Sequence, residues 1–394
     1  MIIREHYIEQ IRNFYHSDLI KIITGIRRCG KSVILEQIMN EVKRDTDNII
    51  FLNFEDKLTT ENIRNYTDLI KYIQKKRKKS KVYIFLDEIQ EVDGWQIACK
   101  TLRLHNASIF ITGSNSKLLS GEFTKELSGR YVAFKVRPFI YKELLEYSKE
   151  LKKNISISDY LICGGFPGRI EQPNESAQKR YLSDLFNTIV LNDLIRRYKI
   201  RKETLFTSLV SYVLRSNSRI FSAKSIYNYI KNENISCSIN TIMKFLNYLE
   251  EAYIIEHMKQ YSSKVKRELS FYEKIYNEDV AFNSLLCQNK RYDLTHNLEN
   301  IVYNELLFRN YELTLYNNNG REIDFLAEKS GKKYYIQVAY SVAEEKTYER
   351  EFGAFKNISQ IDKKIIITND DIDYSTSNVK HILLKDFLID GNLE

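Results

Sequence analysis

A short apolar strand that runs into a glycine-bounded loop is the feature that most constrains this chain. Residues 20–33 read IKIITGIRRCGKSV, in which Gly25 and Gly30 bracket four residues and Lys31 and Ser32 follow. Glycines let the backbone turn tightly and aim its N–H groups inward, so that a polyphosphate fits into the concavity. The run VILEQIMNEV that follows predicts a helix, whose N-terminus favours a bound anion. The segment therefore predicts a βα unit with a phosphate-binding loop.

Each residue type in this loop suits the binding of a nucleoside triphosphate. The Lys31 ammonium supplies a positive charge for the β- and γ-phosphates, and the Ser32 hydroxyl can coordinate Mg²⁺. A chance glycine-rich turn is the alternative, but the strand before the loop and the helix after it argue against one. We expect contacts to the nucleotide from the whole loop, which consists of Gly25, Ile26, Arg27, Arg28, Cys29, Gly30, Lys31, Ser32 and Val33.

A second motif ends in two acids. VYIFLDEIQEV has five apolar residues followed by Asp87 and Glu88, as a buried parallel strand that ends at the carboxyl edge of its sheet would have. We predict that Asp87 holds Mg²⁺ through water and that Glu88 polarises the attacking water as the general base. The alternative is an acidic helix cap after a core strand. Beside the phosphate-binding loop, the acidic pair predicts hydrolysis rather than binding alone.

The order of apolar runs predicts an α/β fold. A helix in residues 1–19 precedes strands near 20–24, 48–53, 82–86, 108–112 and 131–136, which alternate with helices as in a parallel sheet. Ser114 and Asn115 follow the fourth strand, where a polar side chain can contact the γ-phosphate or the attacking water. Arg130 can stabilise charge on the transferred phosphoryl group from the same chain or a neighbour. The sequence does not choose between it and two other arginines, Arg103 and Arg137.

Composition sets broader bounds. The 394 residues are too many for one typical domain, and 43% of them are hydrophobic, enough for real cores. No run reaches the length of a membrane span and the N-terminus has no signal-peptide pattern, which predicts a cytoplasmic protein without a membrane partner. The net charge of +8 and the basic run KKRKKSK at 75–81 permit a nucleic-acid partner without requiring one. The five cysteines are scattered without a CxxC pair, which disfavours a zinc site.

The middle of the chain is predicted to be helical. The bend CGGFPGRI at 163–170 interrupts a helical linker region over residues 151–201. Residues 202–275 resemble a winged helix, with two helices, AKSIYNYIKN and TIMKFLNYLEEA, before a wing strand, YIIEHMKQYS. The second helix carries Lys244 but also Glu250 and Glu251, so a packing module is as good an interpretation as a DNA reader.

Residues 276–394 resemble the restriction-endonuclease-like, PD-(D/E)XK α/β fold. In that fold an acid on a helix, an Asp on one strand and Glu/Gln-x-Lys on the next hold a metal for phosphodiester cleavage. The resemblance places Glu305, Asp324 and Gln337 at the ligand positions, but Ala339 stands where the lysine belongs. We therefore predict an inactive nuclease-like domain. A lysine that has migrated to Lys332 or Lys333 is the open alternative.

As a whole, the chain resembles prokaryotic AAA-type ATPases that couple an N-terminal P-loop domain to a C-terminal domain of unknown function. The resemblance rests on six segments that occur in order over almost the full length: GIRRCGKS, LDEIQEV with Trp95, ITGSN, LSGR, GGFP and the GREIDF…IQV hairpin. It implies an AAA-type ATPase domain in residues 1–150 and the cofactors ATP and Mg²⁺.

Three hypotheses for the function follow. The leading one is an ATPase that uses Lys31, Ser32, Asp87 and Glu88 and couples its nucleotide state to movement of the C-terminal modules. The second is a protein that binds or processes DNA or another nucleic acid and is switched by ATP. The third is a regulatory protein that binds ATP without turnover. A homo-oligomer is left open, because an arginine finger can come from a neighbouring copy.

Overall fold

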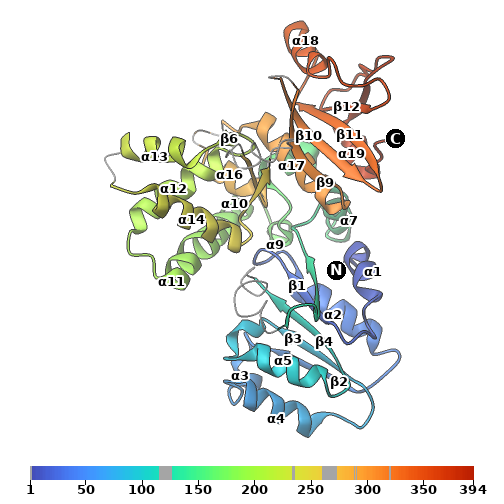
Figure 1. Cartoon of the computed structure of the whole chain (residues 1–394), viewed down its shortest axis with the longest axis vertical. Helices are drawn as coiled ribbons and strands as arrows, with labels where there is room; N and C mark the ends of the chain where they lie inside the picture. Colours follow the sequence, from blue (N-terminus) through green and yellow to red (C-terminus); the bar gives the residue numbers. More distant parts are fainter. Residues whose placement is uncertain are drawn as a thin grey trace. The chain divides into compact units, whose positions relative to one another are not determined.

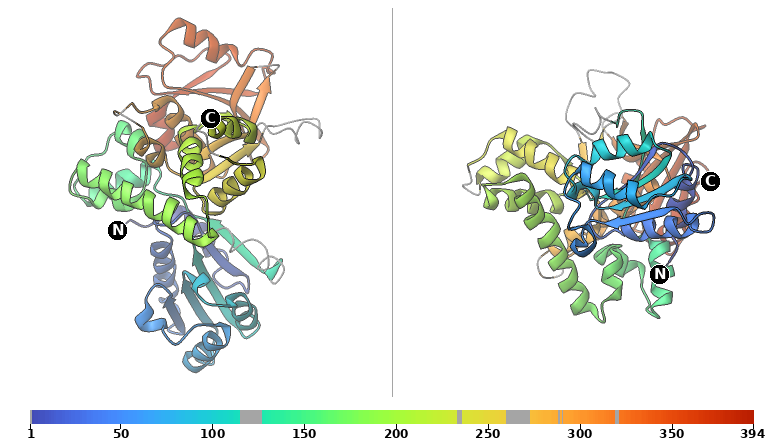
Figure 2. Two further views of the ribbon diagram at one scale, coloured as in Figure 1. Left: turned by 90° about the vertical axis from the view of Figure 1, so that its left-hand side faces the viewer. Right: turned by 90° about the horizontal axis from the view of Figure 1, so that it is seen from below.

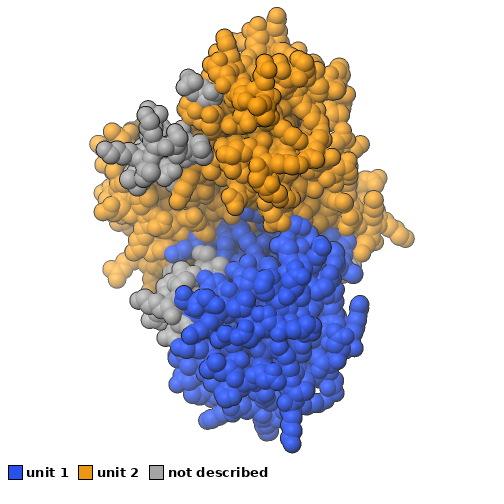
Figure 3. Space-filling view, turned by 45° about the vertical axis from the view of Figure 1, so that its right-hand side comes forward, with its two compact units in different colours: residues 1–138, 251–253 blue, residues 139–250, 254–394 orange. Residues whose placement is uncertain are grey.

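The computed structural model describes residues 2–114, 127–232, 236–259, 273–287, 289, 291–318 and 321–394. They form two compact units, which Figure 3 draws in different colours. The first unit comprises residues 1–138 and 251–253, and the second comprises residues 139–250 and 254–394. Within the described ranges, no helix has the length and apolar character needed to cross a membrane.

The first unit is built on a five-stranded sheet with the order β2-β3-β4-β1-β5 (Figure 1). All neighbouring strands are parallel, which confirms the predicted sheet. Every residue of β1, β3 and β4 is buried, and for this reason these strands read as continuous apolar runs. The strands are β1 (Ile20–Thr24), β2 (Ile49–Asn53), β3 (Val82–Asp87), β4 (Ala107–Gly113) and β5 (Tyr131–Lys135).

Helices cover both faces of this sheet (Figures 1 and 2). On one face, α2 (Lys31–Val42) contacts β1, β3 and β4, and α1 (Glu5–Arg12) packs on α2. On the other face, Leu69 and Ile73 of α4 (Tyr66–Lys76) and Ala98 and Leu102 of α5 (Trp95–Arg103) join one core with Ile20 and Ile22 of β1. The short α3 (Lys57–Thr60) follows β2. The loop between β1 and α2 therefore lies at the carboxyl edge of a sheet that is packed on both faces.

A lysine is buried in the core of this unit. The Lys21 side chain on β1 is fully buried, and its Nζ donates to Ser108 Oγ at 2.7 Å and to Ser17 O at 3.2 Å. The ammonium lies 4.4 Å from the ring centroid of Phe110. Burial and, to a smaller extent, the nearby charge of Lys81 lower the pKa of Lys21 to about 7.

Lys21 should therefore make stability depend on pH. Above pH 7 the folded state releases a proton that the unfolded state keeps up to about pH 10.5, so stability rises with pH in this window. Between pH 7 and pH 9, the wild-type free energy of unfolding should rise by about 2 kcal/mol more than that of Lys21→Met. Guanidinium unfolding of both proteins at the two pH values measures this difference. An equal pH dependence of the two proteins would contradict the prediction.

The second unit begins with a run of helices. Its first part consists of α7 (Tyr141–Glu150), α8 (Ile157–Cys163), α9 (Pro167–Glu171), α10 (Glu175–Phe186), a π-helical segment (Asn187–Asp193) and α11 (Leu194–Tyr198). Next come α12 (Glu203–Arg215), α13 (Ala223–Asn232) and α14 (Ile239–Glu251), with a three-stranded antiparallel sheet of order β6-β8-β7. Its strands are β6 (Ile220–Phe221), β7 (Ile255–Lys259) and β8 (Glu273–Asn277). The identification of this module as a winged helix stays a prediction.

A five-stranded mixed sheet forms the C-terminal part of the second unit, in the order β13-β12-β11-β10-β9. β9, β10 and β11 pair antiparallel, whereas β11, β12 and β13 pair parallel. The strands are β9 (Glu312–Asn318), β10 (Arg321–Lys329), β11 (Lys332–Ala339), β12 (Lys363–Thr368) and β13 (Lys380–Leu383). The helices are α16 (Val280–Leu285), α17 (Leu294–Phe308), α18 (Glu345–Gly353) and α19 (Leu384–Asp390). The identification of this C-terminal part as a nuclease-like fold also stays a prediction.

The glycine-rich bend is fixed by a buried acid more than 100 residues away in the sequence. Asp279 caps α16 by accepting from Ala281 N at 2.8 Å, and its other oxygen accepts from Gly165 N at 2.7 Å. Burial raises the pKa of Asp279 to about 6, although both amide bonds favour the charged form. A Cβ at Gly164 would lie 1.6 Å from Asp279 Oδ1, so only glycine fits at this position.

Candidate functional site

The backbone of the loop after β1 needs its glycines. Gly25 has a φ of 141° and Gly30 a φ of 99°, values that side chains of L-residues rarely adopt. A Cβ on Gly25 would lie 2.1 Å from Val136 O, so the loop packs directly against the backbone that follows β5. The Cys29 thiol is buried and donates to the same carbonyl at 3.3 Å.

Lys31 begins α2, and its side chain turns back over the loop. Its Nζ donates to Gly25 O and Ile26 O, both at 3.2 Å, and lies 3.9 Å from Glu88 Oε1. Only 4% of the Lys31 side chain is exposed. The ammonium thus lies inside the curve of the loop, where a phosphate would meet both it and the backbone amides. In contrast, Arg27 points to the partly exposed Glu55, with which it pairs at 3.0 Å.

Asp87 ends β3 beside the start of α2. Its Oδ1 accepts from the Thr112 hydroxyl at 2.5 Å, and the Ser32 hydroxyl lies near enough to lower the pKa of this carboxyl group. Burial raises the pKa of Asp87, whereas the two hydroxyls lower it. The structure therefore brings together Ser32 and Asp87, a hydroxyl and a carboxylate of the kind that hold Mg²⁺.

Glu88 follows with a left-handed backbone, at φ 52° and ψ 49°. Its N–H donates to Thr112 Oγ1 at 2.9 Å. Its carboxylate accepts from the Gln90 amide and, at 3.5 Å, from the Ser114 hydroxyl. Ser114, predicted from its place after the fourth strand, thus lies beside Glu88. Asn115 lies outside the described residues.

Of the three candidate arginines, two lie toward the amino edge of the sheet and one lies at its carboxyl edge. Arg130 precedes β5, and its carbonyl accepts from Ile20 N at the amino end of β1, about 13 Å along the strand from the phosphate-binding loop. Arg103 pairs with Asp18, which precedes β1. Arg137 follows β5 at the carboxyl edge and is buried. Of the three, the structure brings only Arg137 to the edge that carries the loop.

One buried side chain beside the loop has no signal in the sequence. Arg4 is 2% exposed, and its Nη1 donates to Cys29 O at 3.0 Å and to Arg137 O at 2.9 Å. A single guanidinium thus links the phosphate-binding loop to the chain that leaves β5. Sequence analysis missed this residue because its partners lie 25 and 133 positions away and no motif marks it.

In the C-terminal part, the predicted acids Glu305 and Asp324 do not lie together. Glu305 is 1% exposed and pairs with Arg309 at 2.6 Å, and burial raises the pKa of Glu305 to about 7. The helix acid that approaches Asp324 is instead Glu299. Six residues of an α-helix turn by about 600°, so these two acids point to different faces of α17. The resemblance had suggested Glu305, but the helical period places Glu299 at the sheet.

A lysine lies among these acids. Lys274 Nζ is 3.0 Å from Glu299 Oε1, 3.0 Å from Asp324 Oδ1 and also bonded to Glu322. Burial opposes the charge on Lys274, but the three carboxylates outweigh it and raise the pKa of Lys274 above its ordinary value. The ammonium is therefore a fixed cation between the carboxylates. Lys332 and Lys333 pair with Glu394 and Glu328 at the other end of the hairpin.

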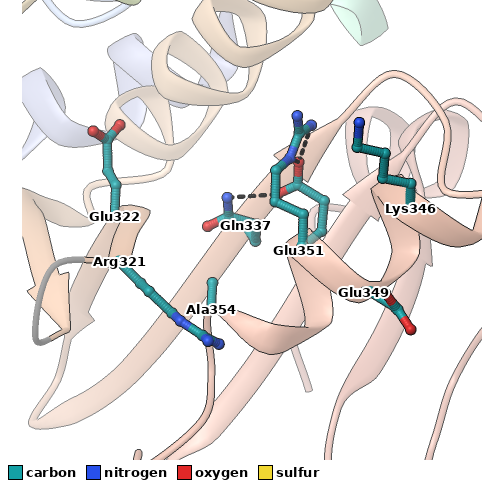
Figure 4. Close-up of a pocket in the computed structure, with 8 residues that line it drawn as sticks. Arg321, Glu322, Gln337, Lys346, Glu349, Glu351 and Ala354 are labelled. Carbon is teal, nitrogen blue, oxygen red and sulfur yellow. Dashed lines mark hydrogen bonds and ion pairs between the residues drawn. The ribbon is translucent and has the colours of Figure 1, made fainter.

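Gln337 lies between Asp324 and a neighbouring pocket. Its Oε1 accepts from Asp324 N at 3.3 Å, and its Nε2 donates to Glu351 at 2.6 Å (Figure 4). The pocket has a volume of about 540 Å³, and its lining mixes cations with acids, among them Arg321, Lys346, Glu349 and Glu351. Ala339 is buried in an apolar cluster with Leu326 and Ile366. Gln337 thus bridges two acidic residues in this structure.

Removal of the Lys274 charge should destabilise the second unit. Lys274→Met leaves Glu299 and Asp324 buried without their cation, and breaking a buried ion pair costs about 3–5 kcal/mol. Urea unfolding, followed by circular dichroism, measures this loss. Lys346→Met, which removes an exposed lysine from the same unit, is the control. Equal stability of Lys274→Met and wild type would show that the cluster needs no cation.

Comparisons with known proteins match this architecture. The model of an AAA domain matches residues 17–145, and models of two domains of unknown function, DUF8612 and DUF4143, match residues 154–292 and 295–386. The Walker-type ATPase PABY2304 of Pyrococcus abyssi superposes with a TM-score of 0.52 at 17% identity, over 73% of this chain and 96% of that one. The first unit therefore has the fold of P-loop ATPases.

Two relatives share most of the chain. An uncharacterized protein of Haemophilus influenzae is 35% identical over 93% of each chain. Uncharacterized protein MJ1544 of Methanocaldococcus jannaschii is 32% identical over 89% of this chain and 82% of its own. The chain therefore belongs to the same family as these two proteins, and in it an AAA domain of the P-loop ATPase type precedes two domains of unknown function.

Proposed function

We propose that this protein binds ATP with Mg²⁺ and hydrolyses it, and that its nucleotide state moves the C-terminal modules. The observation that carries the proposal is the meeting of Lys31, Asp87 and Glu88 at one edge of the parallel sheet. A cation inside an amide-lined loop, a hydroxyl–carboxylate pair and a second carboxylate are the groups that phosphoryl transfer to water requires.

The proposed roles follow from the contacts. Lys31 and the loop amides would hold the β- and γ-phosphates, and Ser32 and Asp87, which lie near each other, would hold Mg²⁺. The metal would neutralise charge on the phosphates. Glu88 would orient and deprotonate the attacking water, with Ser114 beside its carboxylate. Of the three candidate arginines, Arg137 is the one best placed near the phosphates, because it follows β5 at the carboxyl edge.

Equilibrium binding of ATP tests the first step. A hydrogen bond to a charged group contributes about 1.5–3 kcal/mol, so Lys31→Ala should raise the Kd for ATP about 10- to 100-fold. Fluorescence titration with a labelled ATP measures the Kd. Lys71→Ala, which removes an exposed lysine of α4, should bind like wild type. If Lys31→Ala and wild type bound ATP equally, the loop would not be the nucleotide site.

A nucleic-acid partner switched by ATP is the second candidate. It is supported by the order of α12, β6, α13, α14, β7 and β8, which fits the winged-helix prediction. The exposed side chains of α14 include Lys244 and Glu250, so this helix does not offer a basic face. DNA binding that weakens steeply with salt and changes with ATP would support the candidate. Lack of binding at low salt would remove it.

We also propose that the C-terminal part does not cleave nucleic acid. The Lys274 ammonium already pairs with the carboxylates that would otherwise attract a metal, and Ala339 lies in an apolar cluster. Incubation of plasmid DNA with the protein and Mg²⁺ or Mn²⁺ should leave the DNA intact. Cleavage that is lost in Asp324→Asn would contradict this proposal.

A further inference from the structure

One hydroxyl contacts both acids of the nucleotide site. Thr112 lies on β4, between the strand that leads into the phosphate-binding loop and the strand that ends in Asp87. It is fully buried. Its Oγ1 donates to Asp87 Oδ1 at 2.5 Å and accepts from Glu88 N at 2.9 Å. Sequence analysis gave this residue no role, because the position of a threonine inside an apolar strand indicates only that it belongs to the core.

From this geometry we infer that Thr112 is a positioning residue for ATP hydrolysis. Its hydroxyl holds the Asp87 carboxylate and the Glu88 backbone in fixed positions relative to each other. The inference rests on the proposed function. It concerns a residue to which the proposed function gives no role.

The chemistry of the hydroxyl makes the arrangement directional. A hydroxyl has one proton to donate and can accept as well, an ionised carboxylate only accepts, and a backbone N–H only donates. Thr112 must therefore donate to Asp87 and accept from Glu88, so one atom fixes both acids. Among the described residues, no other side chain hydrogen-bonds to both the Asp87 carboxylate and the Glu88 amide.

The Glu88 backbone has a particular need for this bond. Its φ of 52° is the left-handed conformation, which non-glycine residues adopt only where their surroundings hold them. The conformation aims the carboxylate at Lys31, Gln90 and Ser114. Without the Thr112 hydroxyl, the buried amide of Glu88 loses its acceptor, and an extended backbone would turn the carboxylate away from these groups. The general base would then be displaced while the loop stays intact.

The test is a comparison of kcat and ATP affinity in Thr112→Val, Thr112→Ser and wild type. Valine keeps the shape and removes the hydroxyl, and a misplacement of about 1 Å can cost about 100-fold in rate. We expect kcat to fall about 100-fold in Thr112→Val, the Kd for ATP without Mg²⁺ to stay unchanged, and the Mg²⁺ concentration for half-maximal rate to rise. Thr112→Ser restores the hydroxyl and should restore most of kcat.

Thr60→Val is the matched control. Thr60 is 4% exposed in the same unit, and its hydroxyl donates to Asp56 O at 2.7 Å, away from the acids. This variant should lose stability but keep kcat. If Thr112→Val melts below the assay temperature, Thr112→Ala and Thr112→Ser provide the same comparison.

The outcomes separate this inference from the proposed function. An active wild type with equal kcat in Thr112→Val, or a kcat that Thr112→Ser does not restore, overturns the inference alone. A rise in the Kd for ATP without Mg²⁺ that accounts for the whole loss of activity also overturns it. A wild-type protein that does not turn over ATP overturns both the proposed function and the inference.

Discussion

Glu88→Gln is expected to lower kcat for ATP hydrolysis at least about 100-fold while ATP binding persists, because general-base catalysis contributes about 10²–10⁴-fold. Glutamine has nearly the same size and keeps the backbone bond from Glu88 N to Thr112. It can still accept from Ser114, but it cannot take a proton from water. Phosphate release at saturating Mg·ATP measures kcat, and fluorescence titration measures the Kd.

Glu91→Gln is the matched control for this change. Glu91 lies three positions further along and forms an exposed ion pair with Lys57 at 3.6 Å. The control should turn over ATP like wild type. A Glu88→Gln protein with the kcat of wild type would remove Glu88 from the chemistry. Loss of ATP binding in the same variant would mean that Glu88 shapes the site rather than acting on water.

Gly25→Ala is expected to abolish ATP binding and to destabilise the first unit. The new Cβ would lie 2.1 Å from Val136 O, well inside van der Waals contact, at a φ of 141°. The backbone conformation alone costs about 1–3 kcal/mol in an alanine, and the clash forces the loop away from β5. Because Lys31 Nζ also bonds to Gly25 O, the displacement would move the ammonium.

Gly129→Ala separates the clash from the backbone strain. Gly129 has a φ of 69°, but nothing lies within 4 Å of a Cβ placed there. This variant should lose about 1–2 kcal/mol and bind ATP normally. Thermal melting and ATP titration of the two variants measure both effects. Equal behaviour of Gly25→Ala and Gly129→Ala would show that close packing of the loop on Val136 does not matter.

The sequence predicted the first unit well because its signals are local. Each strand is a short apolar run bounded by polar residues, and β1, β3 and β4 are buried on both sides, so each of their predicted limits lies within one residue of the observed limit. The phosphate-binding loop and the acids were predicted because glycines, a lysine and paired carboxylates in this pattern are typical of nucleotide-binding sites.

The rest depends on contacts between distant residues. Arg4 reaches Arg137, Thr112 reaches Asp87 and Lys274 reaches Asp324, and each partner becomes visible only when strands and helices pack. The choice of Glu305 came from a family pattern, which does not say which turn of α17 faces the sheet. Arg130 was a candidate because it precedes the last strand of the sheet, but the parallel pairing of β5 with β1 places it at the amino edge.

Steady-state release of phosphate from Mg·ATP, measured side by side for wild type and Lys31→Ala, tests the central claim most directly. The proposed site predicts a linear, Mg²⁺-dependent release by the wild-type protein that falls to the background rate in Lys31→Ala. Equal rates in the two proteins, or no release by wild type at saturating Mg·ATP, would contradict it.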